Sequence, residues 1–255
     1  MTDFTSARAK LNRAAEHYQA FQTVLDAYLA SQPVSLASRP NPAGSGDDYY
    51  VSLARSLPPE LNTIFGDCVH NLRAVLDHTV QALAVANGGD PNDRTTAFPI
   101  CRNAAEFAKA AKRNLKPLND QGRSFIESLQ PYNRQGRPGT LFELRHLDDR
   151  DKHRAIVEHR LELTAFMEWT DRRIRIEYAE QPKLAHGAFY ATVRYDWSYD
   201  GPKATPPIIA AIAVERSNLV GFIDARNFLR DEAFPFIRAI VVECERGFPA
   251  TQGSA

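Results

Sequence analysis

One long helix constrains this chain more than any other feature. Pro58-Pro59-Glu60 suits a first helical turn, where proline is tolerated, and Gly88-Gly89 ends the pattern. Between them, apolar residues recur at helical spacing, which predicts a buried helix. Its inward stripe is Ile64, Cys68, Leu72, Val75, Thr79 and Ala82, flanked by Phe65, Val69, Leu76, Val80 and Leu83. The helix also carries charged groups that are costly to bury, so it either pairs them internally or forms a site around them.

Composition excludes several classes of protein. The 255 residues suffice for one large domain or two small ones. Lys plus Arg and Asp plus Glu are both 31, and a net charge of zero argues against strong non-specific binding of nucleic acid, although a local basic patch is allowed. The odd number of widely spaced cysteines, Cys68, Cys101 and Cys244, argues against a cysteine-based zinc site.

The same features predict where the protein resides. The polar start of the chain lacks the apolar core of a signal peptide, and no apolar run is long enough to span a bilayer. Unpaired cysteines suit a reducing compartment. We therefore expect a cytoplasmic location and no membrane partner.

The first part of the chain reads as mostly helical. Helices are expected near residues 7–30, 60–87, 103–114 and 118–129, and from Thr140 onward. The Pro-, Ser- and Gly-rich residues 33–48 predict a loop, and residues 49–55 predict a short strand.

The pattern changes to period two from about residue 156. Strands are expected at residues 159–166, 173–178, 190–195 and 208–214, and a closing helix from Ser217-Asn218 through Val220, Ile223 and Phe228, kinked or split at Pro235. The fold class is therefore α+β: a helical N-terminal bundle, then a small antiparallel sheet and a closing C-terminal helix. We divide the chain into residues 1–155, the helical region, and residues 156–255, packed as one unit with the first.

The polar residues of the long helix form two neighbouring rows. His70, Arg73 and Asp77 share one face, whereas Asn71 and His78 share the next. Arg73 and His78 are five apart, about 140° around the axis, so they meet only at the edge of a cleft or from two helices of a dimer. The simpler interpretation is internal pairing, with Arg73 and Asp77 as an ion pair.

A second polar cluster runs from Arg145 to Arg154. Most charge runs are solvated turns between elements, which is the simpler interpretation here. The functional interpretation is that Lys152, His153 and Arg154 face the first cluster and add positive charge. Because polar groups on a buried helix need partners, we expect the helix with Arg73 and His78 to pack near an Asp151–Arg154 turn. Asp149 and His153 have metal-ligand spacing but no third ligand, so no metal site and no cofactor are predicted.

Arginine and histidine together suit phosphate chemistry. A guanidinium donates two hydrogen bonds to a phosphate, and an imidazole can move a proton near neutral pH. RNA carries its own nucleophile, the 2′-hydroxyl. Such a pair could therefore cleave RNA without a metal.

Arg73-Ala74-Val75-Leu76-Asp77-His78 resembles the R-x(4–6)-H motif of the HEPN superfamily of helical, often ribonuclease, domains. With Asp151-Lys152-His153-Arg154 further on, residues 1–155 also resemble a group of uncharacterised bacterial proteins. The resemblance implies that Arg73 positions phosphate and His78 acts as acid or base in a dimer cleft. The substrate would be contacted by His70, Asn71, Asp77, Lys152, His153 and Arg154.

The leading expectation is thus RNA binding and metal-independent cleavage by a HEPN-like homodimer, with no DNA partner. One rival is a non-catalytic interaction or dimerisation protein whose polar helix holds its core together. Another is a small-ligand pocket between the helices and the sheet. The observation that separates these hypotheses is whether Arg73 and His78 open to solvent beside Lys152 and His153, or are buried with partners.

Overall fold

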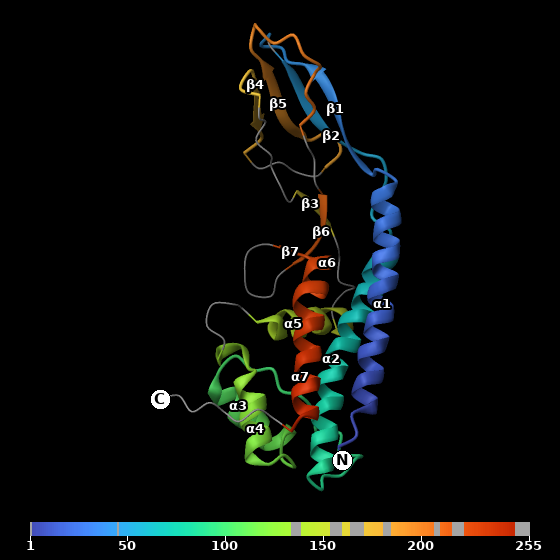
Figure 1. Cartoon of the computed structure of the whole chain (residues 1–255), viewed down its shortest axis with the longest axis vertical. Helices are drawn as coiled ribbons and strands as arrows, with labels where there is room; N and C mark the ends of the chain where they lie inside the picture. The colour runs from blue at the N-terminus through green and yellow to red at the C-terminus, as the bar shows by residue number, and fades with distance from the viewer. Residues whose placement is uncertain are drawn as a thin grey trace. The chain divides into compact units, whose positions relative to one another are not determined.

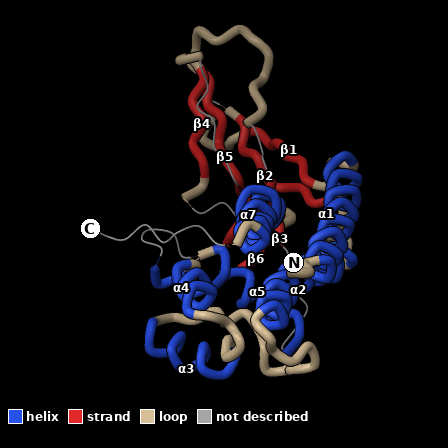
Figure 2. The backbone as a smooth tube through the Cα atoms, turned by 60° about the horizontal axis from the view of Figure 1, so that its bottom comes forward, coloured by secondary structure: helices blue, strands red, loops and turns tan. Residues whose placement is uncertain are grey.

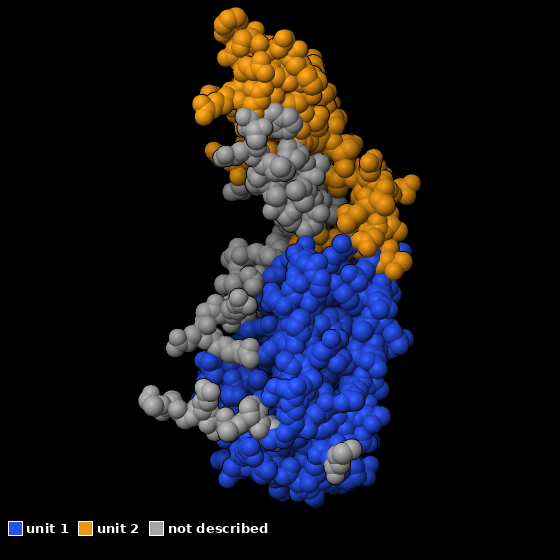
Figure 3. Space-filling view, in the orientation of Figure 1, with its two compact units in different colours: residues 1–22, 60–158, 214–255 blue, residues 23–59, 159–213 orange. Residues whose placement is uncertain are grey.

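The structure is a computed structural model. It describes residues 2–44, 46–133, 139–153, 160–163, 171–180, 185–206, 210–215 and 222–247. The chain divides into two compact units, each assembled from separate segments (Figure 3). Unit 1 comprises residues 1–22, 60–158 and 214–255, and unit 2 comprises residues 23–59 and 159–213. Helices near both ends of the chain and an antiparallel sheet confirm the predicted α+β class.

Unit 1 is mainly helical (Figure 2). Its elements are the part of α1 (Thr5–Ala30) up to Gln22, α2 (Glu60–Ala86), α3 (Ala104–Asn114), α4 (Asp120–Ser128), the 3₁₀ turn η1 (Pro131–Asn133), α5 (Thr140–His153), β7 (Phe222–Asp224), α6 (Ala225–Asn227), the π-helical η2 (Phe228–Ala233) and α7 (Phe234–Glu245).

Helix α2 lies at the centre of unit 1, beside α1 and α7 (Figure 1). The rings of Phe21 in α1 and Phe65 in α2 have centroids 5.8 Å apart, and the Cys68 thiol donates to the carbonyl of Ala14. Leu72 has no exposed surface, which confirms its predicted core position. Buried side chains occupy more than one face of α2, so polar residues on it must find partners inside the unit.

Two predicted boundaries in unit 1 were wrong. Residues 151–153 of the predicted Asp151–Arg154 turn are instead helical, as part of α5, which packs on α2, and Arg154 lies outside the described residues. The predicted closing helix does not include Ile223, which lies in β7. The helical run starts at Ala225 because the Asp224 carboxylate accepts the amide N–H of Asn227 and caps it. Val220 lies outside the described residues.

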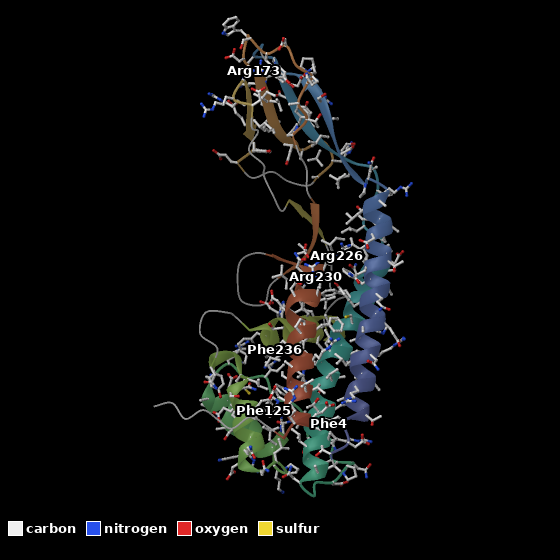
Figure 4. All side chains as sticks on the ribbon, in the orientation of Figure 1. Phe4, Phe125, Arg173, Arg226, Arg230 and Phe236 are labelled. Atoms are coloured by element: carbon white, nitrogen blue, oxygen red, sulfur yellow. The ribbon has the colours of Figure 1, made fainter. Side chains whose placement is uncertain are left out.

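Pro235 occupies the first turn of α7, where a missing N–H is tolerated. The backbone changes from π-helical to α-helical at Phe234, next to this proline. Arg226 and Arg230 project from the start of the run (Figure 4). The kink or split expected at Pro235 is therefore replaced by an unbroken helical run that changes helix type at Phe234.

Unit 2 contains a four-stranded antiparallel sheet of order β1-β2-β5-β4. Its strands are β1 (Val34–Pro40), β2 (Asp47–Leu53), β4 (Ile174–Tyr178) and β5 (Phe189–Tyr195). Strand β3 (Arg160–Leu163) pairs antiparallel with β6 (Ala210–Glu215).

Strand β1 corrects the prediction of a loop over residues 33–48. Leu36 pairs with Val51 of β2, and both Val34 and Leu36 pack against buried residues on one face of the sheet. Pairing with β2 and burial of these alternate side chains outweigh the low strand propensity of the surrounding Pro and Ser residues.

The two units do not follow the linear division predicted at residue 155. Strands β1 and β2, from the first half, belong to the unit that contains β4 and β5, and α7, from the end, belongs with α2. The predicted boundary itself lies outside the described residues, in 154–159. In the part of the chain that the structure describes, no helix is both long and apolar enough to cross a membrane.

Candidate functional site

The two polar clusters meet where α2 packs on α5, as predicted. His70 Nδ1 lies 3.0 Å from Oδ1 of Asp148, whose side chain is almost completely buried. One turn earlier on α2, Gly66 faces Asp151, and a Cβ at position 66 would overlap that carboxylate. The absence of a side chain at Gly66 therefore permits the close approach of the acidic face of α5.

Arg73 is held by partners inside unit 1. Its Nη1 donates to Oδ1 of Asp77 at 2.7 Å, and its Nη2 donates to the carbonyl of Phe98 at 2.9 Å. The same Asp77 oxygen accepts the amide N–H of Phe98 at 2.8 Å. Only 17% of the Arg73 side chain is exposed. Arg73 and Asp77 thus act together as a clamp on the backbone of Phe98.

The clamp is part of a larger arrangement around the extended segment Phe98–Cys101. Buried Gln130 accepts the amide N–H of Cys101 through Oε1 and donates to the carbonyl of Pro99 through Nε2, both at 2.9 Å. Arg145 of α5 donates to the carbonyl of Ile100 at 2.7 Å. None of the described strands pairs with this segment, and side chains satisfy the backbone groups that a sheet would otherwise satisfy.

His78 faces a different neighbour from Arg73. Its Nδ1 hydrogen-bonds with Oγ of Ser6 in α1. Burial lowers the pKa of His78, and the nearby Lys10 lowers it further, whereas Asp77 opposes the shift. The imidazole is therefore favoured in its neutral form beside α1, while Arg73 is directed toward the Phe98 backbone.

The Asn71 amide is also used within α2. Asn71 is buried, and its Nδ2 donates to the carbonyl of Asp67 at 2.8 Å, one turn earlier in the same helix. This local bond satisfies the amide donor without any partner outside the helix.

An open pocket of about 460 Å³ borders the clamp. Its charged lining consists of Arg73, Asp77, Glu106, Arg113, Arg145, Asp148 and Asp149, and residues 97–101 complete the wall. Many of these groups are already paired: Asp148 with His70, Arg73 with Asp77, and Arg145 with Asp149 at 3.4 Å. The pocket thus offers a wall of mixed charge, and His78 does not line it.

The predicted site residues therefore separate into distinct environments. His70, Arg73 and Asp77 lie on the side of α2 that meets α5 and the Phe98 segment, whereas His78 lies against α1. The side chains of Lys152 and His153, and all of Arg154, lie outside the described residues. Sequence reasoning missed Gln130, whose position just before the helix-breaking Pro131 was its only signal.

Other chemistry is restricted by burial. All three cysteines are free and buried, and burial raises the pKa of each thiol, for Cys244 to about 12. A thiol held protonated in this way is a poor nucleophile. Among the described residues, no group of three or more His, Cys, Asp and Glu side chains is arranged to hold a metal ion.

No protein-family model, curated protein or solved structure matches this chain. Function must therefore be argued from the chemistry of the site.

Proposed function

We propose that this chain is a non-catalytic binding protein, in which the polar residues of α2 stabilise the helical unit. One observation carries the proposal: Arg73 uses its guanidinium on Asp77 and the Phe98 carbonyl, with only 17% of its side chain exposed. A phosphate would have to displace both of these interactions. This is the buried, partnered arrangement that favours a structural role for the polar helix.

The position of His78 supports the same proposal. Cleavage of RNA needs the phosphate-binding and proton-moving groups within hydrogen-bond reach of one substrate. Arg73 contacts residue 98, whereas His78 contacts Ser6 of α1. Within one chain, these two side chains serve separate interfaces of α2.

The second candidate function is the metal-independent ribonuclease suggested by the HEPN-like motif. The lowered pKa of His78 favours it, because a neutral imidazole can accept a proton at neutral pH. In that case Arg73 of one chain and His78 of another would have to act together in a homodimer. A cytoplasmic location fits either candidate, since all three cysteines are free.

One experiment distinguishes these functions. The purified full chain, Arg73→Ala and His78→Ala are incubated with labelled RNA with and without a chelator, and thermal unfolding is measured on the same samples. Arg13→Ala is the matched control, because Arg13 is an exposed residue of α1 that pairs with the exposed Glu16 three residues later.

We expect intact RNA with every sample and a lower melting temperature for Arg73→Ala than for Arg13→Ala, because Asp77 and the Phe98 carbonyl lose their donor. Cleavage by the parent that is abolished in both variants, with unchanged melting temperatures, would overturn the proposal and establish the ribonuclease.

A further inference from the structure

One face of the four-stranded sheet in unit 2 carries an ordered set of polar, charged and aromatic side chains. We call it the outer face, because it lies opposite the side on which Tyr49, Val51 and Val193 are buried. The strand register places Arg39, Asp48, Thr192 and Glu177 in one row across β1, β2, β5 and β4. Neighbouring rows on the same face are defined by the pairs Tyr50–Phe189 and Arg194–Arg175.

Two aromatic rings mark one end of the outer face. The centroids of Tyr50 and Phe189 are 5.9 Å apart in an edge-to-face arrangement. The guanidinium of Arg39 lies 5.1 Å from the centroid of Tyr50, and 41% of Phe189 remains exposed. A large aromatic side chain held open at an ordered strand position gives a flat surface for another ring to stack on.

Two arginines mark the other end. Arg175 and Arg194 are direct cross-strand partners, an arrangement in which like charges repel. Arg194 donates to Glu177 at 3.1 Å. Among the described residues, Arg175 and the exposed Arg39 have no ion-pair partner. An anion bound beside Arg175 and Arg194 would relieve this repulsion.

The outer face has a positive net charge. It carries three arginines, Arg39, Arg175 and Arg194, against two carboxylates, Asp48 and Glu177. Asp48 accepts hydrogen bonds from the Asn41 amide at 2.6 Å and the Thr192 hydroxyl at 2.7 Å, and Glu177 is paired with Arg194. Arg173, in the adjoining turn (Figure 4), does not add to this positive charge because Arg173 pairs with Asp171 and lies over the ring of Tyr199.

The geometry points to single-stranded nucleic acid as the partner of this outer face. A base would stack on the exposed ring of Phe189, which Tyr50 supports edge-on, and phosphates would contact Arg39, Arg175 and Arg194. Stacking on exposed aromatic rings combined with arginine contacts to the backbone is how sheet surfaces bind single strands. The inference rests on the proposed non-catalytic function and names the class of partner that such a protein would hold.

The composition of the outer face favours this partner over a protein. Of the described residues on it, only Ala37 is aliphatic, so apart from the two aromatic rings the face offers no apolar surface to a protein partner. A double helix also fits less well, since its bases are already stacked on one another and cannot reach the rings.

The test is fluorescence anisotropy with labelled oligouridylate of about ten nucleotides, the matching oligothymidylate and an RNA duplex, at about 50 mM salt. The variants are Phe189→Ala, Tyr50→Ala, Arg39→Ala and Arg175→Ala in the full chain. The controls are Val85→Ala, which removes a similarly exposed apolar side chain (43%) from unit 1, and Arg13→Ala, which removes one exposed charge there.

We expect binding of the single strands over the duplex, weakened on the order of tenfold by Phe189→Ala. Each arginine variant should reduce the slope of log affinity against log salt by about 0.7. Both controls should bind like the parent. The better bound of the two single strands identifies the nucleic acid as RNA or DNA. Circular dichroism checks folding, and should Tyr50→Ala unfold, the exposed arginine positions still test the outer face.

Failure of this inference is distinct from failure of the proposed function. No binding by the folded parent, or equal binding by parent and outer-face variants, overturns the partner assignment. Electrophoresis of the same RNA samples measures RNA cleavage independently of the binding measured by anisotropy. Shortened RNA that depends on Arg73 and His78 would overturn the non-catalytic function, whatever the anisotropy shows.

Discussion

The helical unit and the sheet unit use arginine in opposite ways. In the helical unit, Arg73 is mostly buried and donates to Asp77 and to the Phe98 carbonyl. In the sheet unit, Arg175 is exposed, stands opposite Arg194, and has no acidic partner among the described residues. The same side chain therefore stabilises the fold in one unit and remains available for a partner in the other.

The cause of this difference lies in the backbone that each unit leaves unsatisfied. No strand in the described part of the chain pairs with the Phe98–Cys101 segment, so its N–H and C=O groups bond to side chains such as Arg73 and Gln130. In the sheet, the ladder between strands satisfies the backbone, and side chains on the outer face have no such task. In this protein, polar side chains remain available to a partner where the neighbouring backbone groups are already hydrogen-bonded to one another, as they are in the sheet.

The largest expected effect concerns the core of the helical unit. Leu72→Ala should lower the free energy of unfolding by about 2–5 kcal/mol, because Leu72 is completely buried and its loss leaves a cavity. Val85→Ala, at an exposed position of the same helix, should change it by less than about 0.5 kcal/mol. Denaturant titration measures both. Equal midpoints for the two variants would mean that the inward face of α2 is wrongly assigned.

The second effect tests whether side chains support the Phe98–Cys101 backbone. Gln130→Leu should destabilise the protein by about 1–3 kcal/mol, because the buried Cys101 N–H and Pro99 carbonyl lose their partner. Gln81→Leu is the matched control: Gln81 also donates to two carbonyls, Asp90 and Pro91, but at a site where water can replace it. A Gln130 variant no less stable than the Gln81 variant would remove the structural argument for this arrangement.

Much of the fold was predictable because it depends on local signals. The position of α2 followed from the prolines before it, the glycines after it and the apolar period between them. Strand β1 was missed because it has only two apolar inward positions, Val34 and Leu36, too few to give a strand pattern. These residues form a strand because they pair with β2. The division into units was beyond the sequence, since it depends on contacts between segments far apart along the chain.

The sequence predicted which elements meet at the candidate site, but not the partners toward which their side chains are directed. Because polar groups on a buried helix need partners, we expected α2 to pack against the second cluster, and the pair of His70 and Asp148 confirms this. Helix geometry already separated Arg73 from His78 by about 140°, yet it could not reveal that the Phe98 backbone occupies the arginine. The partners of that backbone, Gln130 above all, come from positions that no short motif connects.

Alanine substitution of one arginine in each unit tests the comparison between the units directly. Arg73→Ala should cost about 1–3 kcal/mol of stability through the unsatisfied Phe98 carbonyl and the unpaired Asp77. Arg175→Ala should stay within about 0.5 kcal/mol of the parent and yet weaken binding of single-stranded nucleic acid. Thermal unfolding measures the stability of both variants, and fluorescence anisotropy measures how tightly both bind single-stranded nucleic acid. The comparison fails if Arg175→Ala is the more destabilising variant.

The smallest expected effect is on the pH dependence of stability. Burial lowers the pKa of His78 below its ordinary value of about 6.5, and the nearby Lys10 lowers it further, whereas Asp77 opposes the shift. The unfolded chain therefore binds a proton at His78 more readily than the folded chain does. As the pH falls below about 6.5, this difference favours unfolding, and the loss of stability is complete below the pKa of His78 in the folded chain.

His78→Gln removes the titration, so the parent should lose more stability than this variant between about pH 7.5 and about pH 5. The control is His17→Gln in α1, the helix that His78 contacts through Ser6, and this variant should follow the parent. Parallel curves for the parent and His78→Gln would mean that His78 is no more buried than a surface histidine, and would reopen its use as a solvent-facing acid or base.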